Sequence, residues 1–235
     1  MLRERRARVA VFTNGTGQTP RAAAARLRAA GLDIADAELL TPAVVAAEHI
    51  RTTYPGEGVL AFGTAGVVEP LIDANVRLLG LDDAGRARVV LVGADPEFTY
   101  DKLVAACSAV WAGAELLVTS MAPYFASRSG RMASPSGAIA AGIRHVTGVE
   151  ATPVGKPSSL VIQVACSRLQ ATPRELVVIG DDLRLEIRMA REARAYSVLV
   201  LSGSSQAADV EATPEPLRPD LVLPVVGDLR SYIGN

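Results

Sequence analysis

The feature that most constrains the fold of this chain is a series of short, continuous apolar runs separated by helical patterns. The runs do not alternate with polar residues, so we expect strands that are buried on both faces of a sheet. Strand and helix alternate along the whole chain, which predicts an α/β protein with parallel sheets. The predicted strands are residues 9–12, 59–63, 88–93, 115–120, 175–180, 196–201 and 221–224.

Helical patterns between these runs carry recognisable ends. Pro20 stands where a first helical residue is expected, and Gly31 follows the last turn of the same pattern. Thr41-Pro42 begins a second pattern in the same way. The predicted helices are residues 20–31, 41–56, 134–148, 158–170 and 184–194.

Composition argues against several classes of protein. The net charge is -1 and aromatic residues make up 4% of the chain, so neither a basic field nor a base-stacking surface is available for nucleic acid. No apolar run approaches the ~20 residues needed to span a bilayer. Cys107 and Cys166 lie in apolar helical patterns, which predicts buried thiols rather than a disulfide or zinc site. We therefore expect a cytoplasmic protein with no nucleic-acid or membrane partner.

The first predicted strand ends abruptly in Thr13-Asn14-Gly15, within the stretch VFTNGTGQTP. A hydroxyl and several backbone amides at such a turn suit an anion, and the positive N-terminal end of the following helix would add to them. The alternative is a simple strand-to-helix turn in which Thr16 or Thr19 caps the helix.

Lys156 is one of only two lysines in the chain and stands in a Gly-Lys-Pro turn before a predicted helix. A compact ammonium in that position suits a phosphate group. The alternative is an ordinary solvated lysine.

Three carboxylates follow the strand at residues 175–180: Asp181, Asp182 and, one turn later, Glu186. Such hard oxygen ligands favour Mg²⁺, which takes one or two carboxylates together with waters and phosphate oxygens. The alternative is an aspartate helix cap, with Glu186 favourable to the helix dipole. An anion-binding turn, a lysine and a carboxylate metal site together predict phosphoryl-transfer chemistry.

At this point the sequence resembles the haloacid dehalogenase-like hydrolases. VFTNGTGQTP, VGKPSS and VVIGDDLRLEI are similar to the second, third and fourth motifs of that family, in that order. Their spacing fits the type IIA branch, in which an α/β cap lies between the second and third motifs. That branch includes p-nitrophenylphosphatases and sugar-phosphate or phosphoglycolate phosphatases. The resemblance implies a Rossmann-like core at residues 1–40 and 151–235, a cap at residues 41–150, and a homodimer formed through the cap.

The resemblance also implies roles for the motif residues. Thr13 would bind a phosphate oxygen through its hydroxyl, and Asn14 and Gly15 would add backbone amides. Lys156 would neutralise the phosphate and the attacking carboxylate.

For the metal site, the resemblance makes Asp181 a ligand of Mg²⁺. Asp182 and Glu186 would tune or hold metal-bound water, although Glu186 stands where the family more often has aspartate. The loop beginning at Thr119-Ser120 replaces the Thr-Asn-Pro-Asp sequence frequent in the family, so the resemblance does not identify the substrate.

One motif of the family has no counterpart here. The nucleophile of these enzymes comes from an Asp-x-Asp motif, and the 235 residues contain no Asp-x-Asp sequence. Two hypotheses follow: a phosphatase of small phosphate monoesters whose nucleophile lies upstream of Met1, or an inactive protein that binds phosphorylated metabolites.

Two features of the sequence predict marginal stability. Arg194 stands near a position where the family has glycine, at the end of a helix. The strand expected to carry the first motif is also missing, which leaves an edge of the sheet exposed.

Overall fold

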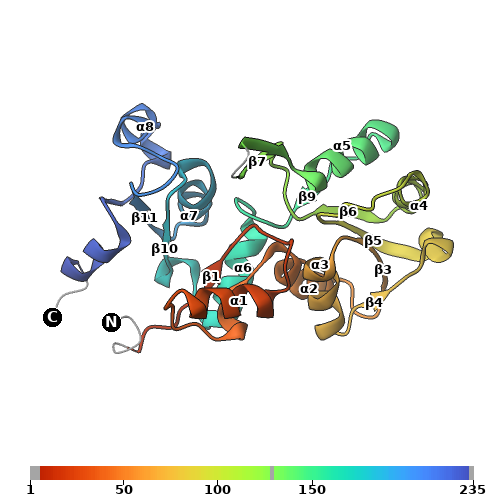
Figure 1. Ribbon diagram of the computed structural model, residues 1–235, viewed down its shortest axis with the longest axis horizontal. Coiled ribbons are helices and arrows are strands. Elements are labelled where there is room, and N and C mark those ends of the chain that lie inside the picture. Colours follow the sequence, from red (N-terminus) through yellow and green to blue (C-terminus); the bar gives the residue numbers. More distant parts are fainter. Residues whose placement is uncertain (1–5, 128–129, 233–235) are drawn as a thin grey trace. The chain divides into compact units, whose positions relative to one another are not determined.

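The computed structural model describes residues 6–127 and 130–232 (Figure 1). The chain divides into two compact units. One unit combines Met1–Ala10 with Lys156–Asn235, and the other is Val11–Gly155. Residues 11–40, which the resemblance places with the core, group here with the residues of the expected cap.

The unit Val11–Gly155 is built on a five-stranded parallel sheet with the order β4-β3-β5-β6-β9. The central strand β5 is paired on both sides, with Val92 opposite Phe62 of β3 and Val118 of β6. The strands are β3 (Gly58–Phe62), β4 (Arg77–Leu78), β5 (Ala87–Val92), β6 (Glu115–Val118) and β9 (Thr152–Pro153).

Helices on this sheet bury its apolar residues. Val90, Val92, Leu116 and Val118 pack in one cluster with Ala106 and other side chains of α4 and α5. The intervening residues Val89, Leu91 and Leu117 are also fully buried, so both faces of the sheet are covered, which explains the continuous apolar runs in the sequence. The helices of the unit are α1 (Pro20–Ala29), α2 (Pro42–Thr53), α3 (Ala65–Asp73), α4 (Tyr100–Trp111) and α5 (Pro135–Thr147).

Two smaller strand pairs complete this unit. β1 (Val11–Phe12) pairs in parallel with β2 (Leu39–Leu40), and Leu39 packs with side chains of α1. β7 (Tyr124–Ser127) and β8 (Gly130–Ala133) form an antiparallel hairpin after β6.

The other unit contains a three-stranded parallel sheet with the order β10-β11-β12. Its strands are β10 (Val177–Gly180), β11 (Tyr196–Val200) and β12 (Leu221–Leu223), and its helices are α6 (Ser159–Leu169), α7 (Arg188–Ala193) and α8 (Ala207–Ala212). A π-helical turn at Leu183–Ile187 leads directly into α7. The sequence predicted a single helix over this π-helical turn and α7.

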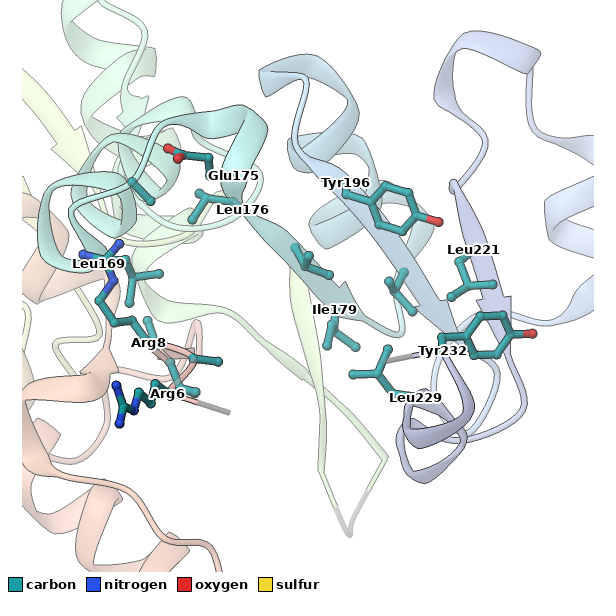
Figure 2. Close-up of a pocket in the computed structure, with 16 residues that line it drawn as sticks. Arg6, Arg8, Leu169, Glu175, Leu176, Ile179, Tyr196, Leu221, Leu229 and Tyr232 are labelled. Carbon is teal, nitrogen blue, oxygen red and sulfur yellow. The ribbon is translucent and has the colours of Figure 1, made fainter. Parts of the chain in front are cut away.

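One face of this sheet borders a cavity of about 710 Å³ (Figure 2). Ile179 of β10, Val198 of β11 and Arg8 are among the residues that line it. Within the described residues, β10 pairs with β11 alone, and Val177 is 56% exposed. The exposed sheet edge that the sequence predicted is therefore present at β10.

The α/β class and all seven predicted strands are confirmed, with ends that differ by a few residues. In the part of the chain that the structure describes, no helix is long and apolar enough to cross a membrane.

Candidate functional site

The Thr13 loop begins where β1 ends. The Thr13 backbone N–H continues the strand pairing by donating to the Leu40 carbonyl at 3.1 Å. The Gly15 N–H donates to the Thr13 hydroxyl oxygen at 3.2 Å, which leaves the hydroxyl proton to donate elsewhere. α1 begins only at Pro20, and Thr19 caps it by accepting from the Ala22 N–H. The positive N-terminal end of α1 therefore lies at Thr19 rather than at Thr13, and the Thr19 side chain already caps it.

The far side of this loop is held against the start of α3. The Thr64 hydroxyl donates to the Thr16 carbonyl at 3.1 Å, and Thr16 is buried. Gly66 lies so close to the loop that a Cβ there would overlap the carbonyl oxygens of Thr16 and Gln18. Only glycine fits this contact, and the close packing fixes the path of the loop.

Gly155, the last residue of the unit Val11–Gly155, packs against the Thr13-Asn14-Gly15 loop of the same unit. A Cβ on Gly155 would lie 2.9 Å from Oδ1 of Asn14 and would overlap the Thr119 carbonyl oxygen. Gly155 therefore lies beside the Thr13-Asn14-Gly15 loop, although about 140 residues separate them in sequence. Sequence spacing alone did not predict this contact.

Lys156 forms an ion pair with Glu186 by donating to its Oε1. The two side chains are only 12% and 11% exposed, so the alternative of a solvated lysine is wrong. The Glu186 side chain packs against Gly180, where a Cβ would overlap it. Its Oε2 accepts from the Asp182 N–H at 3.3 Å. The structure thus engages Glu186 with the lysine and with the backbone that follows β10.

Asp182 serves as a helix cap. Its Oδ1 accepts from the Arg184 N–H at 2.7 Å, and the π-helical turn begins at the next residue, Leu183. The structure therefore shows Asp182 in the role of a helix cap, the alternative to a metal ligand that the sequence left open.

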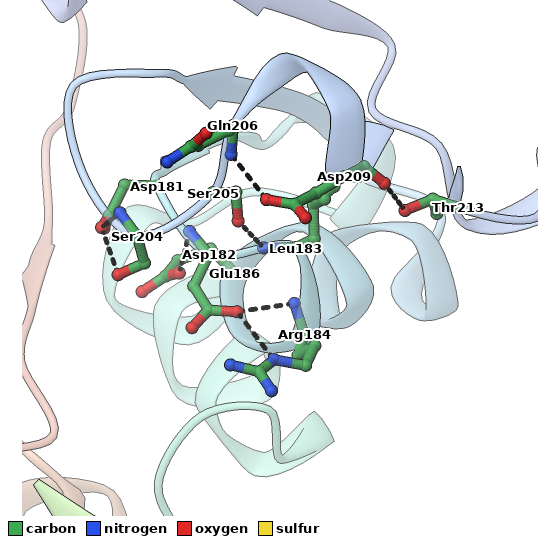
Figure 3. A network of polar contacts seen from close by, with 10 residues as sticks. All are labelled: Asp181, Asp182, Leu183, Arg184, Glu186, Ser204, Ser205, Gln206, Asp209 and Thr213. Carbon is green, nitrogen blue, oxygen red and sulfur yellow. Dashed lines mark hydrogen bonds and ion pairs between the residues drawn. The ribbon is translucent and has the colours of Figure 1, made fainter. Parts of the chain in front are cut away.

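Asp181 is held by the loop that follows β11 (Figure 3). The backbone N–H and the hydroxyl of Ser204 both donate to Asp181 Oδ2, at 2.8 and 2.9 Å. Desolvation by burial raises the pKa of Asp181, but the Ser204 hydrogen bonds and the charge of Lys156 outweigh it. The net result is a pKa below the ordinary value for aspartate, so this carboxylate is ionised at neutral pH.

The three predicted metal-binding carboxylates do not form a common site. Within residues 6–127 and 130–232, no three His, Cys, Asp or Glu side chains converge closely enough to hold a metal ion. Asp182 and Glu186 are engaged as described above, so a three-carboxylate site is not formed. Asp181 alone fits Mg²⁺, which needs only one or two protein carboxylates when phosphate and water supply the other oxygens.

The contact of Ser204 with Asp181 was not predicted from the sequence. The signal was present as Gly203-Ser204-Ser205, small polar residues directly after a buried strand. Because β10 and β11 are parallel neighbours, their carboxyl ends meet at one edge of the sheet, which places this loop beside Asp181.

A parallel α/β protein with a hydroxyl-bearing loop, a largely buried lysine and a strand-end carboxylate has the groups that phosphate esters require. Two family profiles match the chain: a HAD-hydrolase-like profile over residues 153–229 and a haloacid dehalogenase-like hydrolase profile over residues 1–77.

Relatives match over most of their length. Ribonucleotide monophosphatase NagD of Escherichia coli K12 is 30% identical over 220 residues, which cover 93% of this chain and 83% of NagD. Dihydroxyacetone phosphatase of Corynebacterium glutamicum is 30% identical over 219 residues, which cover 93% of this chain and 77% of the relative. The chain belongs to the haloacid dehalogenase-like hydrolases, and within them to the type IIA phosphatases.

Solved structures agree with this assignment. The hypothetical protein PH1952 of Pyrococcus horikoshii superimposes with a TM-score of 0.90 at 26% identity, covering 99% of this chain and 89% of the other. NagD from E. coli K-12 superimposes with a TM-score of 0.85 at 27% identity, covering 97% and 86%.

Proposed function

We propose that this protein is a Mg²⁺-dependent phosphatase of small phosphate monoesters such as sugar phosphates. The observation that carries the proposal is the Lys156–Glu186 ion pair, because it holds a largely buried ammonium beside the carboxylates that follow β10. The names of the relatives point the same way: one is a dihydroxyacetone phosphatase, and an acid sugar phosphatase of Staphylococcus epidermidis is 26% identical.

In this proposal, the Thr13 hydroxyl and the amides of Asn14 and Gly15 bind the phosphoryl oxygens. Lys156 offsets their negative charge, and its ion pair with Glu186 orients the ammonium. Asp181 holds Mg²⁺, which when bound neutralises charge that develops on the phosphoryl group. The cap, residues 41–150, closes over the substrate and excludes bulk water.

The attacking group is proposed to come from outside these residues. No Asp-x-Asp sequence occurs in the chain. We propose that a strand ending in Asp-x-Asp, encoded upstream of Met1, supplies the nucleophile.

The test measures phosphate release from p-nitrophenyl phosphate and a panel of sugar phosphates, with Mg²⁺ and with a chelator. Two proteins are compared: the 235-residue chain and a form extended upstream through an Asp-x-Asp strand. We expect Mg²⁺-dependent turnover by the extended form, and at least about 100-fold lower turnover in its Thr13→Ala, Lys156→Met and Asp181→Asn variants. Absence of Mg²⁺-dependent turnover across the panel would refute the proposal.

The missing Asp-x-Asp sequence favours a second candidate, a catalytically inactive protein that binds phosphorylated metabolites. Such a protein would be stabilised against heat by phosphate esters, with no turnover in its natural full-length form. Any turnover that depends on Lys156 would reject this candidate.

A further inference from the structure

The loop after β11 contacts Asp181 through side chain and backbone together. Both Ser204 donors reach the same carboxylate oxygen, Oδ2. The neighbouring Gly203 leaves the space for this contact, since a Cβ there would overlap Oδ2. The loop therefore requires glycine at position 203, beside the Asp181 carboxylate, and a hydrogen-bond donor at position 204.

Ser205 fixes the backbone of the same turn. Its N–H donates to the Asp181 carbonyl at 3.0 Å, and its hydroxyl oxygen accepts from the Leu183 N–H at 3.1 Å. Ser205 is only 6% exposed. Ser205 thus fixes the main chain on both sides of Asp182, through its backbone N–H on one side and its hydroxyl on the other (Figure 3).

These contacts have a geometric consequence for a cation. Two hydrogen bonds to Oδ2 set the plane of the carboxylate, and Oδ1 is the oxygen that the Ser204 donors do not use. A preoriented ligand loses less conformational entropy on binding metal. Partners that orient a metal ligand in this way change metal affinity by about 10–100-fold when removed.

We propose that Gly203-Ser204-Ser205 is a positioning loop that orients Asp181 for Mg²⁺, with Ser204 as its principal donor. This inference rests on the proposed function, because it assigns Mg²⁺ to Asp181. Ser204 acts through Asp181 and does not itself touch substrate or metal.

The experiment is isothermal titration of the upstream-extended form with Mg²⁺ and with Mn²⁺, together with thermal melts without metal. Ser204→Ala should raise the dissociation constant about 10-fold with little change in melting temperature, because Ser204 is exposed. Ser204→Thr keeps the hydroxyl and should restore the affinity. Ser202→Ala is the matched control: an exposed serine of the same loop whose side chain makes no hydrogen bond within the described residues.

Each other outcome refutes a specific claim. Parental affinity in Ser204→Ala would overturn the positioning role and leave the proposed function standing. An equal loss in Ser202→Ala, or melting of Ser204→Ala below the titration temperature, would show that the loop acts only on folding. If the parent and Asp181→Asn alike bind no metal, the proposed Mg²⁺ site fails, and the positioning role with it.

Discussion

At the scale of single residues, Arg194 ends α7 in the left-handed region, with φ 60° and ψ 31°. A residue with a Cβ adopts this conformation at a cost of about 1 kcal/mol, whereas glycine adopts it freely. Arg194→Gly should therefore raise the free energy of unfolding by about 0.5–1 kcal/mol, measured by urea denaturation. Arg194→Ala keeps the Cβ and is the control; an equal gain in that variant would contradict the explanation.

Asp220 is a second residue whose environment makes a measurable prediction. Its Oδ2 accepts from the N–H and the hydroxyl of buried Ser197, at 2.8 and 2.7 Å, and Arg191 donates to its Oδ1. Desolvation by burial raises the pKa of Asp220, but the Ser197 hydrogen bonds and Arg191 outweigh it and lower the pKa overall.

A lowered pKa in the folded state stabilises the protein above the unfolded pKa of about 3.9, and this contribution is lost as pH falls through the folded value. Asp220→Asn should lower the free energy of unfolding by about 1–2 kcal/mol at pH 7. Urea denaturation as a function of pH should show the two curves converging below about pH 4. Glu57→Gln, which removes a carboxylate at an exposed turn, is the control. A difference between Asp220→Asn and its parent that persists in acid would contradict the electrostatic cause.

At the scale of elements, the contact of α3 with the Thr13–Gln18 loop makes Gly66 critical. Gly66→Ala places a Cβ against two backbone carbonyls, so either the helix or the loop must move. We expect a loss of about 1–3 kcal/mol in unfolding free energy and weaker binding of inorganic phosphate. The control is Gly142→Ala within α5, where a Cβ meets nothing within 4 Å and helix propensity predicts a gain of up to about 1 kcal/mol. Equal changes in melting temperature for Gly66→Ala and Gly142→Ala would show that the contact of Gly66 with the loop does not limit stability.

The elements also show which parts of the structure a sequence can predict. Strands such as β5 and β11 were predicted because a continuous apolar run is a local property of the chain. The two-residue strands β2, β4 and β9 have no period to detect, and the β7–β8 hairpin was also missed. Thr13, Lys156 and Asp181 could be proposed as site residues because each follows a local strand or turn signal. Their partners were not, since the Lys156–Glu186 and Asp181–Ser204 contacts join residues far apart in sequence.

At the scale of the whole molecule, the two units should differ in stability. The unit Val11–Gly155 has a five-stranded sheet whose central strands are covered by a large apolar cluster. The other unit has a three-stranded sheet, a face that borders a cavity of about 710 Å³, and, within the described residues, an unpaired edge at β10. Unpaired strand edges and uncovered apolar faces lower the free energy of local opening.

Native-state hydrogen exchange tests this difference. Backbone amides of Val177–Gly180 in β10 should exchange at least about 100-fold faster than those of Val89–Val92 in β5, which corresponds to about 3 kcal/mol in opening free energy. Calorimetry should show a first transition from the unit that contains β10. The upstream-extended form provides the matched comparison: if a strand pairs with β10, protection should rise in β10 and stay unchanged in β5. A single cooperative melt of the 235-residue chain, with equal protection in β5 and β10, would show that the β10 edge does not limit stability.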